Sequence, residues 1–351
     1  MSENELLVQC SDHTGLIRLN RPAALNSLTL GMVRDFAQAL EDFAADPNIL
    51  AVVVMGEGGR GFCAGGDLRA LYRARGMERN PFKTFWREEF GLNARIARFP
   101  KPYIALMDGI VMGAGIGLSA HGNCRIVTER TRLAMPETRI GFIPDVGGSW
   151  LLTRKGGAGR YMALSGEPVG AGDAIRLGLA DFLVVSERLP ELLKAVMDIH
   201  RAEDIPAIIQ GLASEPEEGL LTRQQDLLDA AMQGDSVEAI LDALTAEGSD
   251  FALWAAQEIG QRSPTSLKLT HALLRHGADA ADLETCLTAE YRVVCALLDT
   301  HDLYEGVRAA IIDKDRRPHW SPERLDQVDD RMVAELLAGT GEPDPEFTSW
   351  S

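Results

Sequence analysis

The sequence lacks any apolar run of the roughly 18 residues that a membrane-spanning helix needs. The best candidate, residues 110–120, is short, rich in glycine and ends at His121. Cysteine is scarce too, and no two cysteines form a CxxC pair. The five are Cys10, Cys63, Cys124, Cys286 and Cys295. An odd, scattered set without metal-ligand spacing indicates a reducing compartment and argues against a disulfide framework or a zinc site. We therefore expect no metal.

Positive charge is the third shortage. Lys plus Arg number 35 against 52 for Asp plus Glu, so the net charge is −17. We expect no nucleic-acid partner, because such binding depends on neutralising phosphates. The first ten residues, MSENELLVQC, lack the basic and apolar segments of a targeting sequence. This predicts a cytoplasmic protein with no membrane partner, although a chain whose leader had been removed would look the same.

The first 200 residues alternate short apolar runs with helical patterns, which predicts an α/β fold with a largely parallel sheet. Residues 8–20 predict two strands around a turn. Residues 29–45 carry apolar side chains at helical spacing, and Pro47 follows the end of this pattern. Further strands are predicted at 50–55, 103–107 and 125–128.

The length of 351 residues predicts about two domains at roughly 150 residues each. We expect an α/β core over residues 1–200 and a mostly helical region over residues 201–351. Between the two patterns, residues 202–219 hold prolines, glycines and acids, and are interpreted as a connector.

Three details of the helical region are predicted from local signals. A helix over residues 264–276 should stop at Gly277, a typical C-terminal cap. Another should begin at Ser321-Pro322, with Ser as the cap and Pro in the first helical position. The tail after Gly339 is expected to be a loose end.

Residues 56–67, GEGGRGFCAGGD, form a glycine-rich turn between a predicted buried strand and a predicted helix. Glycines let the backbone turn sharply, and free N–H groups at such a turn can bind an oxyanion or a phosphate. A purely structural turn explains the spacing as well. The string has neither GxGxxG at the offsets from strand and helix that a dinucleotide loop needs nor GxxxxGK[ST], so a nucleotide loop is disfavoured.

Residues 108–117, DGIVMGAGIG, place four glycines at the start of a predicted buried helix. Glycine inside a helix costs roughly 1 kcal/mol relative to alanine, so several together need a reason. One reason is tight packing of the helix on the sheet. The other is that N–H groups near Ala114 face a developing negative charge.

Residues 135–148, MPETRIGFIPDVGG, place two acids among apolar residues, prolines and glycines. Desolvated carboxyl groups have raised pKa values and can act as acid, base or nucleophile. Glu137 and Asp145 are therefore candidate catalytic residues. The alternative is that either acid caps a helix or pairs with Arg139 or Arg154.

These three strings together resemble the crotonase (enoyl-CoA hydratase/isomerase) superfamily over the first ~200 residues. Further strings extend the resemblance over nearly the whole chain and are similar to one branch, the 3-hydroxyisobutyryl-CoA hydrolases. They are WREEF at 86–90, DFALWA at 250–255, SPTSLKLT at 263–270, EYRV at 290–293, HDLYEGVRAAIIDKD at 301–315 and PHWSP at 318–322.

The resemblance implies a ββα spiral core that binds a small-molecule acyl-CoA. Two N–H groups would form an oxyanion hole for the thioester carbonyl, here those of Gly66 and Ala114, the second usually being a glycine in the family. The adenine end of CoA would lie near Leu25 and Ala64. Candidate cations for the CoA phosphates are Arg69, Arg73 and Lys314.

The resemblance also implies which acidic residues take part in the reaction. The hydratases use two glutamates, of which one aligns with Glu137 and the other with Gly117, which has no side chain. This departure argues against alkene hydration. The hydrolase branch implies Asp145 as the second catalytic carboxylate and Glu89, rather than its neighbour Glu88, as a substrate contact.

The implied reaction is thioester hydrolysis in valine degradation. Glu137 would attack the carbonyl as a nucleophile or activate water as a base. Asp145 would protonate the thiolate or steer water. Glu89, Ala114, Glu137 and Asp145 would bind the acyl group. No cofactor is expected beyond the CoA of the substrate, and a homo-oligomer is a further expectation because superfamily members often form trimers.

Two reactive side chains receive structural interpretations. Cys63 lies beside the oxyanion turn, but no histidine is nearby in sequence, so a small packed residue is expected. His121 follows the central helix and is expected to cap it or to pack.

Overall fold

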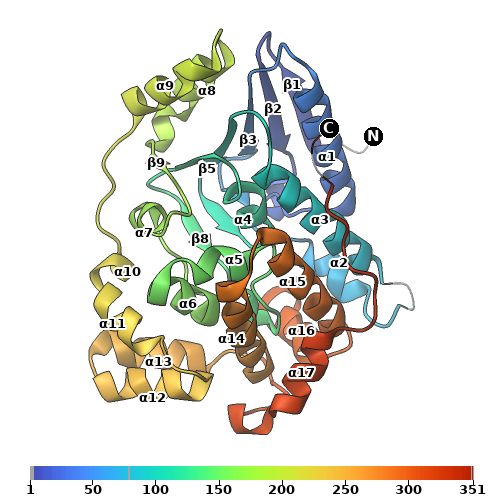
Figure 1. Ribbon diagram of the computed structural model, residues 1–351, viewed down its shortest axis with the longest axis vertical. Coiled ribbons are helices and arrows are strands. Elements are labelled where there is room, and N and C mark those ends of the chain that lie inside the picture. Colours follow the sequence, from blue (N-terminus) through green and yellow to red (C-terminus); the bar gives the residue numbers. More distant parts are fainter. Residues whose placement is uncertain (1–3, 78–79, 349, 351) are drawn as a thin grey trace.

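This computed structural model describes residues 4–77, 80–348 and 350. The larger of its two sheets has six strands, in the order β1-β2-β3-β5-β7-β9 (Figure 1). Only β1 and β2 pair antiparallel, around the predicted turn; every other pair is parallel. The strands are β1 (Leu6–Cys10), β2 (Thr14–Leu19), β3 (Ala51–Gly56), β5 (Tyr103–Met107), β7 (Cys124–Val127) and β9 (Phe182–Leu183).

A second, three-stranded sheet is parallel throughout, in the order β4-β6-β8. Each of its strands follows a strand of the large sheet along the chain: β4 (Gly61–Cys63) after β3, β6 (Ile110–Met112) after β5, and β8 (Arg132–Ala134) after β7. Helices follow each pair, so the strand–strand–helix unit repeats, and the predicted ββα spiral is confirmed. The prediction of a helix over residues 110–112 is wrong: they form β6, and the helix α4 (Ala114–Ser119) starts after it.

The helices of the spiral hold the segments that line the site. Thr29 caps α1 by accepting from the N–H of Met32, which confirms the predicted helix. Asp67 likewise caps α2 by accepting from the N–H of Ala70. The helices are α1 (Leu30–Ala45), α2 (Leu68–Arg73), α3 (Pro81–Ala97), α5 (Gly148–Thr153), α6 (Gly156–Ser165) and α7 (Ala171–Arg176).

The large sheet is buried on both faces, because side chains alternate between two separate clusters. Along β3, Val52 and Val54 enter the main core, whereas Ala51 and Val53 face a second cluster. That second cluster is covered by α8 (Leu189–Met197) and α9 (Ile205–Leu212). The interpretation of residues 202–219 as a connector is therefore wrong in part: α9 lies within them, since Ile205, Ile209 and Leu212 form an apolar stripe that the prolines obscure.

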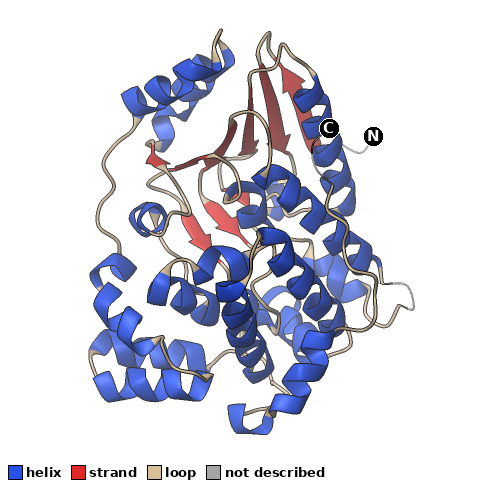
Figure 2. Ribbon diagram, viewed as in Figure 1, coloured by secondary structure: helices blue, strands red, loops and turns tan. Residues whose placement is uncertain are grey.

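Helices dominate from residue 220 onward and gather below the sheets in Figure 2. Their apolar faces join the same main core as the spiral, while the division at residue 200 stays a prediction. No helix of the described chain is both long and apolar enough to span a membrane. The helices are α10 (Leu220–Arg223), α11 (Gln225–Ala231), α12 (Val237–Glu247), α13 (Asp250–Gly260), α14 (Pro264–Asp279), α15 (Leu283–Leu297), α16 (His301–Val307) and α17 (Asp330–Ala338).

Two predicted helix boundaries are wrong. Helix α14 continues past Gly277, which serves close packing instead: a Cβ there would lie 2.4 Å from the Ser149 carbonyl oxygen. No helix begins at Ser321-Pro322. The Ser321 N–H donates to Asp302 Oδ1 at 2.7 Å, and the next α-helix begins at Asp330, capped by Asp329.

The tail after Gly339 is bound to the body rather than loose. Glu342 pairs with Lys83 of α3 at 2.6 Å, and Asp344 pairs with Arg292 of α15 at 2.6 Å. Trp350 donates to the Arg95 carbonyl at 2.9 Å. The tail therefore ties α3 to α15, two helices that each bring a carboxyl group to the site or to its support.

Candidate active site

One cavity collects most of the predicted site residues. Gly66, Ala114, Glu89, Glu137 and Asp145 all line it, although they are spread over 80 positions of the sequence. The rest of the wall is mainly apolar, and we call this space the acid cavity. Its apolar lining is Leu68, Leu71, Phe82, Phe85, Trp86, Met112, Ile140 and Phe142.

Two backbone N–H groups at the cavity wall are available to a ligand. The turn that contains Gly66 is fixed from both sides: the Leu28 N–H donates to the Gly65 oxygen at 2.9 Å, and the Asp67 N–H to the Leu28 oxygen at 3.1 Å. Ala114 is the first residue of α4 and has no acceptor within that helix. Over the described ranges, neither the Gly66 nor the Ala114 N–H donates to the chain. Both can therefore donate to an oxygen in the cavity.

The predicted CoA contacts lie at one side of this turn. Ala64 lines the cavity, and its N–H donates to the Leu25 oxygen at 3.0 Å, so the two residues are neighbours. Arg69 of α2 donates to the Ile311 oxygen at 3.2 Å. Arg69, Arg73 and Lys314 are all exposed. Their contact with CoA stays a prediction.

Glu137 lies against the oxyanion region. It begins a short 3₁₀ helix, Glu137–Ile140, and is only 6% exposed. A Cβ at Gly113 would lie 2.8 Å from Glu137 Oε1, so the carboxyl group reaches the residue before Ala114. Glu137 Oε2 is buried without a partner in the chain. The alternative of a pair with Arg139 does not hold, because Arg139 pairs with Glu167.

Asp145 lies on a tight turn that precedes α5. Its side chain is 5% exposed, and its carbonyl oxygen accepts from the Gly148 N–H at 2.7 Å. The alternative partner, Arg154, instead stacks over Trp150, with its guanidinium carbon 3.3 Å from the ring centroid. Asp145 is thus free to act on a ligand in the acid cavity.

Glu89 and its neighbour Glu88 have opposite environments. Both belong to α3, but Glu89 is 1% exposed and lines the cavity, with Oε1 lacking a partner. Glu88 points outward and pairs with Arg34 at 2.6 Å. The choice of Glu89 over Glu88 therefore agrees with the geometry, because successive helical residues point in different directions.

The electrostatics of the acid cavity are unusual. Of its described lining residues, none is a lysine, arginine or histidine. Burial raises the pKa of Glu137 well above its usual range, and the nearby Asp145 charge adds to this. The pKa of Asp145 is raised by burial and by the charge of Glu290, and that of Glu89 by burial and by Asp145 and Glu137. The three groups therefore titrate as a unit that retains protons above the usual carboxyl range.

A family model described as enoyl-CoA hydratase/isomerase matches residues 14–337. The chain belongs to this family. A protein of Xenopus laevis named mitochondrial 3-hydroxyisobutyryl-CoA hydrolase is 40% identical over 94% of this chain and 88% of its own length. The Homo sapiens protein of the same name is 38% identical over 98% of this chain and 91% of its own length.

Two similar solved structures carry different names. A carnitinyl-CoA dehydratase from Mycobacterium thermoresistibile has a TM-score of 0.93 at 42% identity, covering 98% of this chain and 99% of its own. An enoyl-CoA hydratase from Rhodobacter sphaeroides has a TM-score of 0.88 at 37% identity, covering 98% of this chain and all of its own. The names of the relatives thus divide between thioester hydrolysis and the addition or removal of water.

The position at which a hydratase would place its other glutamate is closed in this chain. A Cβ on Gly117 would lie 2.7 Å from Asn93 Nδ2 and 2.8 Å from Val146 Cβ. Asn93 is fully buried, one turn after Glu89 on α3, and neither of its amide atoms has a partner in the chain. The space for a longer side chain is therefore already filled by Asn93 and Val146.

Two buried polar residues, Asn93 and Glu290, were not predicted from the sequence. Asn93 could have been found from its helical spacing with Glu89, since residues four apart share a helix face. Glu290 belongs to the EYRV string, but nothing local indicates that its helix packs against the turn that carries Asp145.

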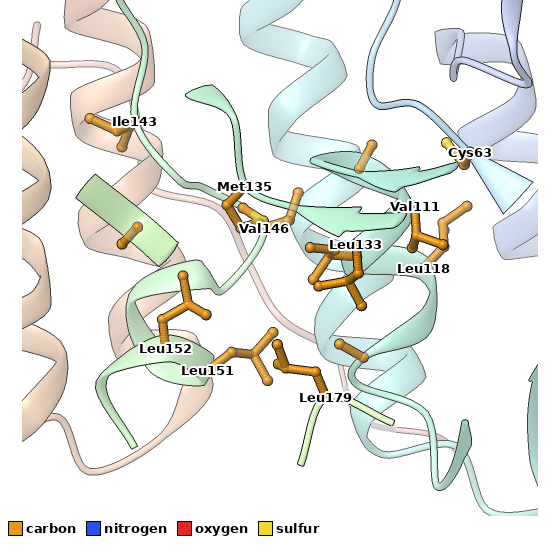
Figure 3. Packing of buried hydrophobic residues seen from close by; sticks show 14 of the residues in the cluster. Cys63, Val111, Leu118, Leu133, Met135, Ile143, Val146, Leu151, Leu152 and Leu179 are labelled. Atoms are coloured by element: carbon orange, nitrogen blue, oxygen red, sulfur yellow. The ribbon is translucent and has the colours of Figure 1, made fainter. Parts of the chain in front are cut away.

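Cys63 and His121 have the expected structural roles. Cys63 is buried in apolar packing near Val111 and Leu118 (Figure 3), and burial raises the pKa of its thiol to about 12. The ring of His121 lies with Nε2 2.7 Å from the Val146 oxygen, and burial lowers its pKa to about 4. Neither is placed to act as a nucleophile or as a base at neutral pH. No group of three or more His, Cys, Asp or Glu residues in the described chain could hold a metal ion.

The burial of Glu137 predicts a pH-dependent effect on stability. Because its pKa is higher in the folded than in the unfolded chain, its contribution to stability falls as pH rises through that range. We expect Glu137→Gln to raise Tm at pH 8 by a few °C relative to the wild type, and less at pH 5. Scanning calorimetry at both pH values measures this, with the exposed Glu191→Gln as control. An equal gain at pH 5 and pH 8 would show that Glu137 ionises as readily when folded as when unfolded.

Proposed function

We propose that this chain hydrolyses 3-hydroxyisobutyryl-CoA to 3-hydroxyisobutyrate and CoA. The observation that carries the proposal is the acid cavity itself, in which three buried carboxyl groups lie beside two N–H groups without acceptors. Relatives about 40% identical over almost the whole chain are named for this hydrolysis. The reaction needs water but no metal or redox group.

The thioester oxygen accepts from the N–H groups of Gly66 and Ala114. Donors of this kind are worth roughly 3–4 kcal/mol each when negative charge develops on the oxygen in a dry site. Substrate carbonyl and developing oxyanion therefore occupy the wall next to Gly113, where Glu137 Oε1 also lies. This arrangement brings a carboxyl group to the electrophilic carbon.

Glu137 then has two routes. As a nucleophile, it forms a bond to the carbonyl carbon while the carbon–sulfur bond breaks, and water hydrolyses the resulting anhydride. As a general base, it takes a proton from water, and the hydroxyl attacks the carbonyl carbon. In both routes Asp145, whose raised pKa favours a protonated carboxyl, supplies the proton to the departing thiolate or steers the water.

Glu89 and Asp145 accept or donate a hydrogen bond at the 3-hydroxyl of the acyl group. Glu89 Oε1 is buried without a partner, so a substrate hydroxyl would satisfy it. The apolar wall of Phe82, Trp86 and Phe142 receives the methyl branch; Trp86 stacks on Phe142 with ring centroids 5.4 Å apart. This predicts a preference for short, hydroxylated acyl groups.

Hydration or dehydration is the second candidate, and the names of the two similar solved structures favour it. Both reactions in the superfamily pattern call for a glutamate at position 117, where this chain has glycine. Asn93 and Val146 fill the adjoining space, which argues against this alternative. Glu89 of α3 is a further carboxyl group in the same cavity, so hydration is measured alongside hydrolysis.

The cellular setting follows from the same proposal. The resemblance to the 3-hydroxyisobutyryl-CoA hydrolases implies that this thioester is an intermediate of valine degradation. The enzyme would therefore act in that pathway. The curated relatives are named mitochondrial, whereas a cytoplasmic site is the prediction from this sequence. A homo-oligomer also stays a prediction.

The first prediction concerns the reaction itself. The purified chain should release thiol from 3-hydroxyisobutyryl-CoA, and Glu137→Gln should lower kcat by 10²–10⁴-fold, the usual range for a general acid–base group. Thiol release is followed with a thiol reagent, and crotonyl-CoA hydration is measured in parallel. No thiol release together with formation of 3-hydroxybutyryl-CoA would overturn the proposal in favour of hydration.

The second prediction concerns the hydroxyl group. Isobutyryl-CoA should be hydrolysed with a kcat/KM at least about 100-fold lower than 3-hydroxyisobutyryl-CoA, because the buried oxygens of Glu89 and Asp145 would lose their partner. Glu89→Gln should narrow this ratio. Glu88→Gln, the exposed neighbour, is the matched control and should leave it unchanged. Equal rates for the two esters would contradict hydroxyl recognition.

A further inference from the structure

Glu290 is a fully buried carboxyl group outside the acid cavity. It lies on α15, in the helical region, yet it accepts three hydrogen bonds from the start of α5: from the Gly147 N–H at 2.7 Å, the Ser149 N–H at 2.9 Å and the Ser149 hydroxyl at 2.5 Å. Neither oxygen contacts a cation. A carboxyl group that served only to fill space would destabilise the fold here, because burial disfavours its charged form.

The three hydrogen bonds hold a strained segment, residues 145–149, which we call the Asp145 turn. Val146 has a φ of 51° and Gly147 a φ of 82°. The left-handed region is unfavourable for a β-branched residue such as valine, so the surroundings must impose this conformation. On one side His121 Nε2 lies 2.7 Å from the Val146 oxygen, and the Val146 side chain is buried near Met135 (Figure 3). On the other side Glu290 binds the N–H groups.

We propose that Glu290 is a positioning residue, which holds the Asp145 turn in the conformation that presents Asp145 to the acid cavity. This inference rests on the proposed hydrolysis for its kinetic consequences, but its structural part does not. It also gives the helical region a role in the chemistry, because α15 supplies the group that fixes a catalytic turn of the spiral.

The carboxylate is chemically suited to this role in a way that an amide is not. Two oxygens accept from donors on two sides, whereas glutamine would direct its NH₂ group at one of these donors and leave that donor unpaired. Asp145 and Glu137 lie on the cavity side of Glu290, and the charge of Glu290 raises the pKa of each. Cys286 lies one turn before Glu290 on α15 and is affected in the same way. His121, at the end of α4, packs against Gly147 of the Asp145 turn, and burial lowers its pKa to about 4. Burial raises the pKa of Glu290 to about 7, against the effect of its three donors.

The test compares Glu290→Gln with Glu284→Gln in the full chain. Glu284 lies on the same helix, but its carboxyl group pairs with Arg98 and makes no hydrogen bond to the Asp145 turn. For Glu290→Gln we expect kcat to fall 10–100-fold, the usual effect of losing a residue that orients a reacting group, with KM within about twofold. The alkaline limb of the pH profile should move to lower pH, because Asp145 loses its proton more easily beside a neutral group. Glu284→Gln should match the wild type in kcat, in KM and in the position of the alkaline limb.

A second variant and a second measurement keep the outcome decisive. If Glu290→Gln does not fold, Ser149→Ala removes only the hydroxyl bond, and should lower kcat several-fold while KM stays unchanged. Carbon-13 titration of the Asp145 carboxyl group, wild type against Glu290→Gln, needs no activity and should show a lower pKa in the variant. If the variant does not fold, the same titration is made with Ser149→Ala. Loss of the hydroxyl donor raises the pKa of Glu290, so Glu290 carries less negative charge and the pKa of Asp145 should fall.

The proposal is overturned if kcat and the pH profile of Glu290→Gln superimpose on those of the wild type. It is also overturned if kcat falls but neither the alkaline limb nor the Asp145 titration moves, which is what a general loss of packing would produce. A wild type without thioester hydrolysis would overturn the proposed function alone, since the Asp145 titration would still decide the role of Glu290.

Discussion

The burial of carboxyl groups without a neighbouring cation is the constraint on which the site depends. Glu89, Glu137 and Asp145 share a cavity whose described lining holds no lysine, arginine or histidine, and Glu290 lies behind the turn that carries Asp145. Such groups cannot all be ionised at neutral pH, because burial and mutual repulsion both oppose charge. The cluster therefore keeps protons available where a reaction that releases a thiolate requires one, and a carboxylate available where an electrophilic carbon is attacked.

The fold supplies this cluster from segments that are distant in sequence. The spiral brings the turn before α2 and the start of α4 to one wall, and these provide the two N–H groups without acceptors. Helix α3 contributes Glu89, the segment after β8 contributes Glu137, and the turn before α5 contributes Asp145. The C-terminal tail ties α3 to α15 on the outside. Because burying carboxyl groups without a cation is unfavourable, such a site must be held in place by the rest of the molecule.

Much of this could be predicted from the sequence because the signals were local. The β-branched run at 50–55, the cap at Thr29 and the glycine-rich turns each specify their own conformation. The acids Glu137 and Asp145 were evident because carboxyl groups seldom occur within apolar, glycine-rich segments, and the order of the strings revealed the family. Glu89 needed the resemblance, since Glu88 beside it is equally acidic.

The parts that were missed depend on contacts between distant segments. Gly277 has the sequence signal of a helix cap, but its role is set by close packing against Ser149. The tail has the composition of a loose end, but Lys83 and Arg292 form ion pairs with its acids. Asn93 fills the space that the missing side chain of Gly117 leaves. Glu290 contacts the turn before α5 because α15 packs on that turn. No pattern within one segment carries such information.

Infrared spectroscopy of the carboxyl groups tests the central claim most directly. Protonated carboxyl groups absorb separately from carboxylates, and isotope-edited difference spectra of the wild type against Glu89→Gln, Glu137→Gln and Asp145→Asn assign the signal. We expect a protonated carboxyl band at pH 7 that is lost or reduced in these variants and disappears as the pH is raised further. A spectrum at pH 7 in which all three groups are ionised would contradict it.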